Sequence, residues 1–444
     1  MIDLSPEMAV FLMFSLMLIG LLSGHPLAFV LGGVGAMVGF LGWGPGALYM
    51  IVARTYSTLT NQILIAIPLF VLMAVFLDKS GIAEGLFTSM MYLFGKLNGG
   101  VALAVTILSV VFAATTGVIG ASVVSMALMS VPVMMKYNYD RKLAAGVVTA
   151  GGTLGILIPP SIMLILMADQ SGQSVGRLFA GALFPGVVLG GLYFLYVLVT
   201  SYRNPDKAPA LSAEELSQVS TAQLLRMLLL NFIPPIVLIL GVLGTIWTGV
   251  ATPTEASGVG AFIAFLLMIM YGKFSWSTLY HSLMQALRTN AMVMATIIGA
   301  SIFTGVFLGL GGDDVVTDII MSLEGFGRWG IFFMMMLIIF LLGFMIDWIG
   351  IIYISFPIFL PIAQQLGFDQ TWFVVMLAIN LQMSFLTPPV GYALFYLKGS
   401  VDPSQINLTD IYKGIVPFIF LQLIGLIICI LFPSLVTYLP SFLG

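Results

Sequence analysis

The sequence predicts an all-α, multi-pass membrane protein built as an inverted-topology repeat of two halves, and three observations lead to this prediction. Of the 444 residues, 60% are hydrophobic and 7% are charged, whereas soluble proteins carry about 25% charged residues. The apolar runs are long enough for spans of about 20 residues, and they lack the alternation of barrel strands. Two proline pairs in apolar runs, at 159–160 and 388–389, are also separated by 229 positions.

The first double proline lies in GGTLGILIPPS, residues 151–161, inside the apolar run 143–168. Proline removes a backbone donor and clashes with the preceding turn, and glycine weakens a helix further. We therefore expect this span to break near its middle. In lipid, a broken helix is tolerated where it lines a cavity or a bound ion.

The second double proline lies in SFLTPPVG, residues 384–391, inside the apolar run 372–397. Asp140 and Asp369 are separated by the same 229 positions. Interrupted spans at matching places in two halves are the best sequence indication of a transporter's binding site.

The other elements of the first half follow from its apolar runs. A hairpin is expected at 100–135, interrupted at 115–122, and an amphipathic arm at 49–60. The full spans are expected at 8–23, 26–44, 62–78, 142–168 and 178–200.

The second half repeats this order after a polar linker at 201–222, which we call the seam. Its hairpin is expected at 330–365, interrupted at 343–350, and its arm at 275–287. The full spans are expected at 227–250, 253–272, 290–309, 371–397 and 411–435. The predicted repeats are 1–222 (scaffold 8–60, transport elements 62–200, seam 201–222) and 223–444 (scaffold 227–287, transport elements 290–435).

The basic residues predict the orientation. Five full spans in each half, an odd number, require the second half to be inverted. With the seam in the cytoplasm, only Arg54, Arg177 and Arg328 of the 15 basic residues lie outside, as the positive-inside rule favours. Both termini are then expected outside, and the hairpins enter the membrane from opposite faces.

Each interruption offers hard oxygen ligands, hydroxyls and freed carbonyls, for a small cation. The alternative for each hydroxyl is a bond back to its own helix. The candidates are Thr116, Gly117, Gly151 and Gly155 in the first half and Gly343, Asp347, Thr387 and Pro388 in the second. Asp347 is the strongest single candidate, because an intramembrane carboxylate needs a partner and no Lys or Arg is nearby in sequence. Its alternative role is an exposed hairpin cap.

Four further residues are candidates for binding the substrate, and they are Ser122, Ser161, Trp348 and Gly350. Ser161 begins the second half-helix, where it either caps the helix or faces the substrate. Trp348 either lines the anion site or anchors the tip. Three acidic residues, Glu255, Asp140 and Asp369, are expected instead to start helices.

Five stretches of the chain resemble the large membrane (M-type) subunit of tripartite ATP-independent periplasmic (TRAP) transporters. Together they cover essentially the full length. The stretches are TTGVIGAS, KYNYDRKLAAGVVTAGGTLGILIPPSIML, ATPTEASGVGAF, GFMIDWIGIIYISFPIFLPI and FLTPPVGYALFYLKG.

This resemblance implies an elevator-type carrier of the bacterial inner membrane, driven by Na+ and taking organic acids with a carboxylate. It implies two partners: a small four-helix membrane subunit (Q type) and a soluble periplasmic substrate-binding protein (P type). By position, Thr116 and Ser161 fall at the first ion and substrate region, and Asp347 and Thr387 at the second.

Two alternatives from other classes remain at this point. One is a stand-alone homodimeric sodium/dicarboxylate-type carrier, which shares the inverted repeat but needs no small membrane partner. The other is an interaction scaffold or an intramembrane enzyme, which is disfavoured because no nucleophile and base are paired in the sequence.

Overall fold

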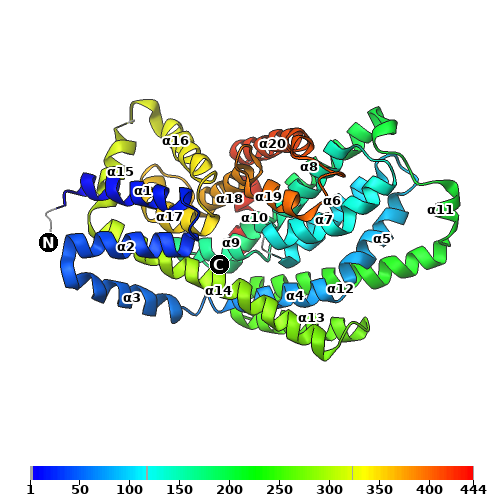
Figure 1. Ribbon diagram of the computed structural model, residues 1–444, viewed down its shortest axis with the longest axis horizontal. Coiled ribbons are helices and arrows are strands. Elements are labelled where there is room, and N and C mark those ends of the chain that lie inside the picture. Colours follow the sequence, from blue (N-terminus) through cyan, green and yellow to red (C-terminus); the bar gives the residue numbers. More distant parts are fainter. Residues whose placement is uncertain (1–3, 117–118, 323, 444) are drawn as a thin grey trace.

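The computed structural model describes residues 4–116, 119–322 and 324–443, without the side chains of 113–116 and 324. The described residues form helices and no strand. Figure 1 shows the second-half hairpin helices α16 and α17 and the first-half hairpin helices α6 and α7 on opposite sides of the molecule, with α18 between them.

In the described part of the first half, ten α-helices precede the seam, most of them apolar. They are α1 (Pro6–Leu22), α2 (Leu27–Trp43), α3 (Ala47–Leu59), α4 (Ala66–Lys79), α5 (Ile82–Phe94), α6 (Gly100–Thr116), α7 (Ile119–Lys136), α8 (Arg141–Thr153), α9 (Ile162–Ser171) and α10 (Val175–Arg203). The seam holds the short helix α11 (Ala213–Ser217).

The second half follows the same order with one fewer separate helix. Its helices are α12 (Thr221–Trp247), α13 (Pro253–Met270), α14 (Trp276–Gly309), α15 (Gly312–Met321), α16 (Gly327–Leu342), α17 (Trp348–Gln365), α18 (Gln370–Leu386), α19 (Tyr392–Ser400) and α20 (Leu408–Leu431). A short α21 (Ser434–Thr437) and a 3-10 turn at Leu439–Phe442 follow α20.

Both expected helix breaks are confirmed. In the first half, α8 ends at Thr153, a 3-10 turn follows at Leu154–Ile156, and α9 begins at Ile162. In the second half, α18 ends at Leu386 and α19 begins at Tyr392. Eight helices of the described part are long and apolar enough to span a membrane, or nine if α4 and α5 form one bent span. The broken spans are not among these, because each of their pieces is too short.

One predicted boundary was wrong, and two helices were not predicted. The arm at 275–287 is not separate from the span at 290–309, because α14 is continuous from Trp276 to Gly309. The two polar residues between them, Arg288 and Thr289, are neither glycine nor proline. Helices α5 and α15 were also missed. Gly81, with φ +78°, separates α5 from α4, and the two helices bend by 57°.

The three predicted helix starts are confirmed. Asp140 accepts hydrogen bonds from the amides of Lys142 and Leu143, and Asp369 accepts one from the amide of Trp372. Glu255 belongs to a capping box with Thr252, in which each side chain bonds the other's backbone amide. Such caps stabilise a helix start by about 1 kcal/mol, so these carboxylates have structural roles.

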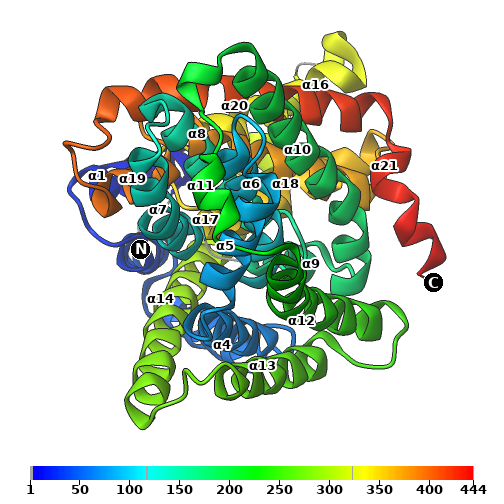
Figure 2. The ribbon, with the colours of Figure 1, turned by 90° about the vertical axis from the view of Figure 1, so that its right-hand side faces the viewer.

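Helices of the two halves pack against one another. Helix α2 packs on α14, α13 on α4, and α8 on α20; Figure 2 shows α4, α12, α13 and α14 gathered along one edge of the molecule. Gly35 of α2 lies against the backbone of Phe303, and Gly146 of α8 lies against the carbonyl of Gly414. Small residues permit this close approach, as is common in membrane helices.

The two broken spans lie side by side and antiparallel. The Gln370 side chain, at the start of α18, donates to the Ser171 carbonyl at the end of α9, over 2.8 Å. Near the middle of both spans, the Gln382 amide donates to the Thr153 hydroxyl over 3.3 Å. Gln382 and Thr153 are themselves 229 positions apart, the same separation as Pro159 and Pro388.

Candidate transport site

The first break is closed by Ser161. Every residue from 151 to 168 is buried. The carbonyls of Gly155 and Ile156 would normally bond the amides four residues later, but those positions are Pro159 and Pro160, which have none. The Ser161 hydroxyl donates to the Ile156 carbonyl over 2.5 Å and accepts from the Leu164 amide, so it caps α9.

The first hairpin packs tightly against the helix before this break. Gly151 lies against the Ser109 side chain of α6, and Gly152 lies against the backbone of Val123 in α7. Of the residues predicted at this hairpin, Ser122 is buried and has a partner. The Thr116 side chain and Gly117 lie outside the described residues.

The second break is held beside the second hairpin tip by two contacts. Gly343, at the end of α16, lies against the Ser384 side chain of α18. The Tyr392 hydroxyl, in the first turn of α19, donates to the Met345 carbonyl over 3.1 Å. Thr387 donates to the carbonyl of Met383 in its own helix over 2.8 Å, which is the alternative weighed for it. Its oxygen keeps lone pairs free to accept or ligate.

Asp347 occupies the N-cap position of α17, with extended backbone (φ −65°, ψ 151°), but its side chain does not complete a cap hydrogen bond. The carboxylate lies beside the amides of Trp348 and Ile349. In the part of the chain that the structure describes, Lys79 and Asp78 form the only ion pair, so Asp347 has no basic partner there.

The second tip also presents free carbonyls. Among the described residues, no backbone amide donates to the carbonyl oxygens of Gly343 or Phe344. Carbonyls, a carboxylate and a hydroxyl form a hard oxygen donor set, the kind that unwound membrane helices offer to Na+. The residues at this tip therefore fit a small cation.

The two other substrate candidates are buried. Trp348 is 7% exposed. At Gly350, an added Cβ would lie 3.4 Å from side-chain atoms of both Leu27 and Leu31 in α2. Gly350 therefore faces α2, while Asp347, three residues earlier, lies at the tip.

Sequence reasoning missed the two tyrosines of α19. Tyr392 bonds the second hairpin tip, and the Tyr396 ring lies against Gly120, next to the first tip. Helix α19 thus contacts both hairpins. The sequence feature that could have predicted this contact is the pair of tyrosines, four positions apart, that follows the second proline pair.

A polar cavity of about 140 Å³ lies at the far end of the first broken span. It is lined by Arg54 of α3, Asp169 of α9 and Tyr353 of α17, among others. The Asn61 side chain donates to the Asp169 carboxylate over 2.6 Å. Asp169 is half-buried and hydrogen-bonded.

Comparison with known proteins decides the family. The model of the family described as "Tripartite ATP-independent periplasmic transporter, DctM component" matches residues 11–435. The chain belongs to this family. The resemblance noted from the sequence motifs is thereby confirmed.

The chain is similar over nearly its whole length to curated members of the DctM family. It is 30% identical to the C4-dicarboxylate TRAP transporter large permease protein DctM of Pseudomonas aeruginosa, covering 93% of this chain and 94% of the relative. It is 27% identical to the 2,3-diketo-L-gulonate TRAP transporter large permease protein YiaN of Escherichia coli, covering 97% and 98%. These relatives are transporter permeases, and the chain is accordingly a multi-pass transporter subunit and not an enzyme.

Two solved structures share the fold. The YdaH transporter of Alcanivorax borkumensis superposes with a TM-score of 0.65 at 12% identity, covering 94% of this chain and 99% of that one. MtrF of Neisseria gonorrhoeae gives 0.54 at 11% identity, covering 87% and 83%. Both are membrane transport proteins.

Proposed function

We propose that this DctM-family chain imports an organic acid across the bacterial inner membrane, coupled to Na+, by an elevator movement. The observation that carries the proposal is the antiparallel pair of broken spans, each packed against the hairpin of its own half. The relatives named above transport C4-dicarboxylates and 2,3-diketo-L-gulonate, which are organic acids, and we extend that substrate class to this chain.

The two halves form an inverted repeat in this proposal. Helices α6 to α10 and α16 to α20 follow the same order at a nearly constant offset. The antiparallel course of the broken spans and the contact between Thr153 and Gln382 are what a two-fold axis in the membrane plane produces. Both termini then lie in the periplasm and the seam in the cytoplasm.

Two Na+ ions, one at each hairpin and its neighbouring break, supply the positive charge that this region lacks. The second ion would be held by Asp347, Thr387, Pro388 and the freed carbonyls near Gly343. The first would be held near Gly151, Gly155, Thr116 and Gly117. A bound ion stabilises the tips in the arrangement that closes around the substrate, since it has few ligands to bind while the tips are apart.

The carboxylate of the substrate is proposed to lie between the tips, near Ser122, Ser161, Trp348 and Gly350. Helices α9 and α17 both begin there, and the positive ends of half-helices favour an anion. Because Ser161 already caps α9, its contribution is to hold that helix start in place.

The scaffold in this proposal comprises α1 to α3, α12, α13 and the first part of α14, and the hairpins and broken spans move against it. The contacts of α2 with α14 and of Gly350 with α2 lie on this sliding surface. The second-half connection between scaffold and transport elements is the unbroken α14, whereas the first-half connection is the loop at 60–65.

A Q-type membrane subunit and a P-type binding protein are the proposed partners. One related protein, the isethionate TRAP transporter permease protein DctMQ of Oleidesulfovibrio alaskensis, is covered over 64% of its length by this chain. Co-purification of a small membrane subunit would distinguish this assembly from a stand-alone homodimeric carrier.

Uptake into proteoliposomes tests the function. The full transporter is reconstituted with its binding protein outside, and a radiolabelled organic acid that this protein retains is supplied. We expect accumulation with an inward Na+ gradient and none when K+ replaces Na+. Accumulation that is equal with both cations would refute the coupling.

A further inference from the structure

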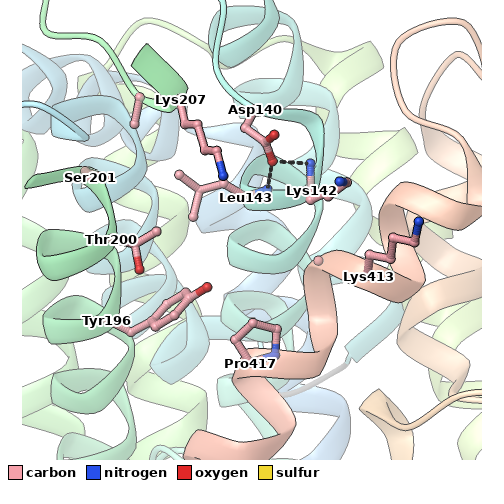
Figure 3. Close-up of a pocket in the computed structure, with 11 residues that line it drawn as sticks. Asp140, Lys142, Leu143, Tyr196, Thr200, Ser201, Lys207, Lys413 and Pro417 are labelled. Atoms are coloured by element: carbon pink, nitrogen blue, oxygen red, sulfur yellow. Dashed lines mark hydrogen bonds between the residues drawn. The ribbon is translucent and has the colours of Figure 1, made fainter. Parts of the chain in front are cut away.

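A second polar cavity lies at the opposite end of the first broken span from the Arg54 cavity. Its volume is about 170 Å³. It is formed where the start of α8, the end of α10, the seam and the start of α20 meet (Figure 3). The residues that matter for its chemistry are Asp140, Lys142, Tyr196, Thr200, Lys207 and Lys413.

Positive charge dominates this cavity. Lys142, Lys207 and Lys413 line it, and none has a carboxylate within 4 Å in the described part of the chain. The one acidic lining residue is Asp140, whose carboxylate oxygen already accepts the amides of Lys142 and Leu143 (Figure 3). The lining therefore holds three exposed lysines against one engaged carboxylate, and the Lys413 side chain points away from Asp140 (Figure 3).

The walls of the cavity are fixed by backbone contacts. The Asp140 amide donates to the Lys207 carbonyl over 2.7 Å, which holds the seam against the start of α8. Gly414 of α20 lies against the Lys142 carbonyl. On the α10 wall, Tyr196 and Thr200 add two hydroxyls (Figure 3). The lysines thus come from three segments that are held together before any ligand binds.

A phosphate group matches this set of donors. Lysine binds phosphate as a point charge, and hydroxyl groups add neutral donors to its remaining oxygens. Basic pockets between membrane helices on the cytoplasmic side bind anionic lipid headgroups. Exposed apolar side chains on the two flanking helices offer a surface for acyl chains, namely Leu195 and Val199 of α10 and Val416 and Phe420 of α20.

We infer that the cavity formed by Lys142, Lys207, Lys413 and Asp140 binds a phosphate group, supplied either by an anionic phospholipid or by a soluble phosphate. The binding joins the seam, α8 and α20. This role is independent of the ion and substrate site, which lies at the other end of α8.

The test uses the full chain purified in detergent and stripped of lipid. Cardiolipin, phosphatidylcholine and inorganic phosphate are titrated separately, and the unfolding temperature is followed, because a ligand of the folded state raises it. The variant is K142Q/K207Q/K413Q. The control, K96Q/K273Q/K398Q, removes the same charge from exposed lysines outside the cavity.

Cardiolipin is expected to stabilise the wild type and the control, while phosphatidylcholine has no effect. The triple variant should need on the order of a hundredfold more cardiolipin, and K207Q alone about fivefold more, since each lysine adds a similar factor. If inorganic phosphate stabilises the wild type to the same extent as cardiolipin, and the triple variant loses this response, the phosphate site is supported and its ligand is a soluble phosphate.

Two results would overturn the inference. One is no stabilisation of the wild type by either phosphate source. The other is an equal loss of response in the variant and the control. If the triple variant does not fold, K207Q decides alone, because Lys207 is an exposed seam residue, and an unchanged cardiolipin response in K207Q would count against the site.

Discussion

Replacing Gly152 with alanine should displace the first hairpin, because Gly152 is where α8 meets the backbone of α7. A Cβ at this position would lie 2.9 Å from the Val123 Cα and 3.0 Å from its amide nitrogen, whereas ordinary contacts are 3.4–4 Å. A helix backbone cannot rotate away as a side chain can. The two helices must therefore separate by several tenths of an ångström.

The size of this effect follows from two opposing terms. Overpacking typically costs about 1–3 kcal/mol, and alanine in a helix gains up to about 1 kcal/mol over glycine. Gly191→Ala in α10 isolates the second term, because no heavy atom lies within 4 Å of its Cβ. The difference between the two variants is then the packing cost, about 1–3 kcal/mol, or roughly 5- to 150-fold in an equilibrium that needs the hairpin in place.

The assay measures the unfolding temperature of both variants and the Na+ concentration that gives half-maximal uptake. Gly152→Ala should unfold at a lower temperature than Gly191→Ala and require more Na+. Equal values for the two variants would show that α7 and α8 are not in contact at Gly152, and the geometry of the first site would be wrong.

Two further predictions concern hydrogen bonds outside the first hairpin. Tyr392→Phe removes the hydroxyl bonded to Met345 and should raise the half-maximal Na+ concentration about fivefold, for a bond of about 1 kcal/mol. The control Tyr271→Phe, whose hydroxyl bonds the Leu230 carbonyl in the scaffold, should leave that concentration unchanged. An equal shift in both variants would contradict a role of Tyr392 at the tip. In the seam, the hydrogen bond from Tyr137 holds the pKa of Glu215 below its usual range. The contact therefore stabilises the folded seam at pH values above the usual carboxyl pKa, and this stabilisation is lost as the pH falls through the lowered pKa. Proteolysis of the seam should accelerate over that acidic range in the wild type and already be fast at neutral pH in Tyr137→Phe; the same pH dependence in both proteins would exclude the contact.

Local chemistry made the breaks and the helix starts predictable. Pro159 and Pro388 act on the turn just before them, and Asp140 and Asp369 cap the helix that follows at once. The position of a helix end was harder to predict where no glycine or proline marks it. For this reason the boundary between 287 and 290 was placed inside what is one helix.

The contacts that assemble the site depend on residues far apart in sequence. Tyr392 and Met345 are 47 positions apart, and no local pattern pairs them. One long-range pair does follow the offset of the proline pairs, because Gln382 and Thr153 are 229 positions apart and hydrogen-bonded. The sequence identifies the candidate site residues, whereas the packing of α19 against both hairpins determines which of them lie together.

The central claim is that cations stabilise the hairpin tips at the two breaks, and a Na+ titration of the purified chain tests it most directly. The unfolding temperature is measured with Na+ or K+ at equal ionic strength, for the wild type and for Asp347→Asn. We predict that Na+ raises the unfolding temperature of the wild type, that K+ does not, and that the variant needs at least about tenfold more Na+ because it loses a charged ligand. An equal rise with both cations, or an unchanged Na+ response in Asp347→Asn, would contradict the claim.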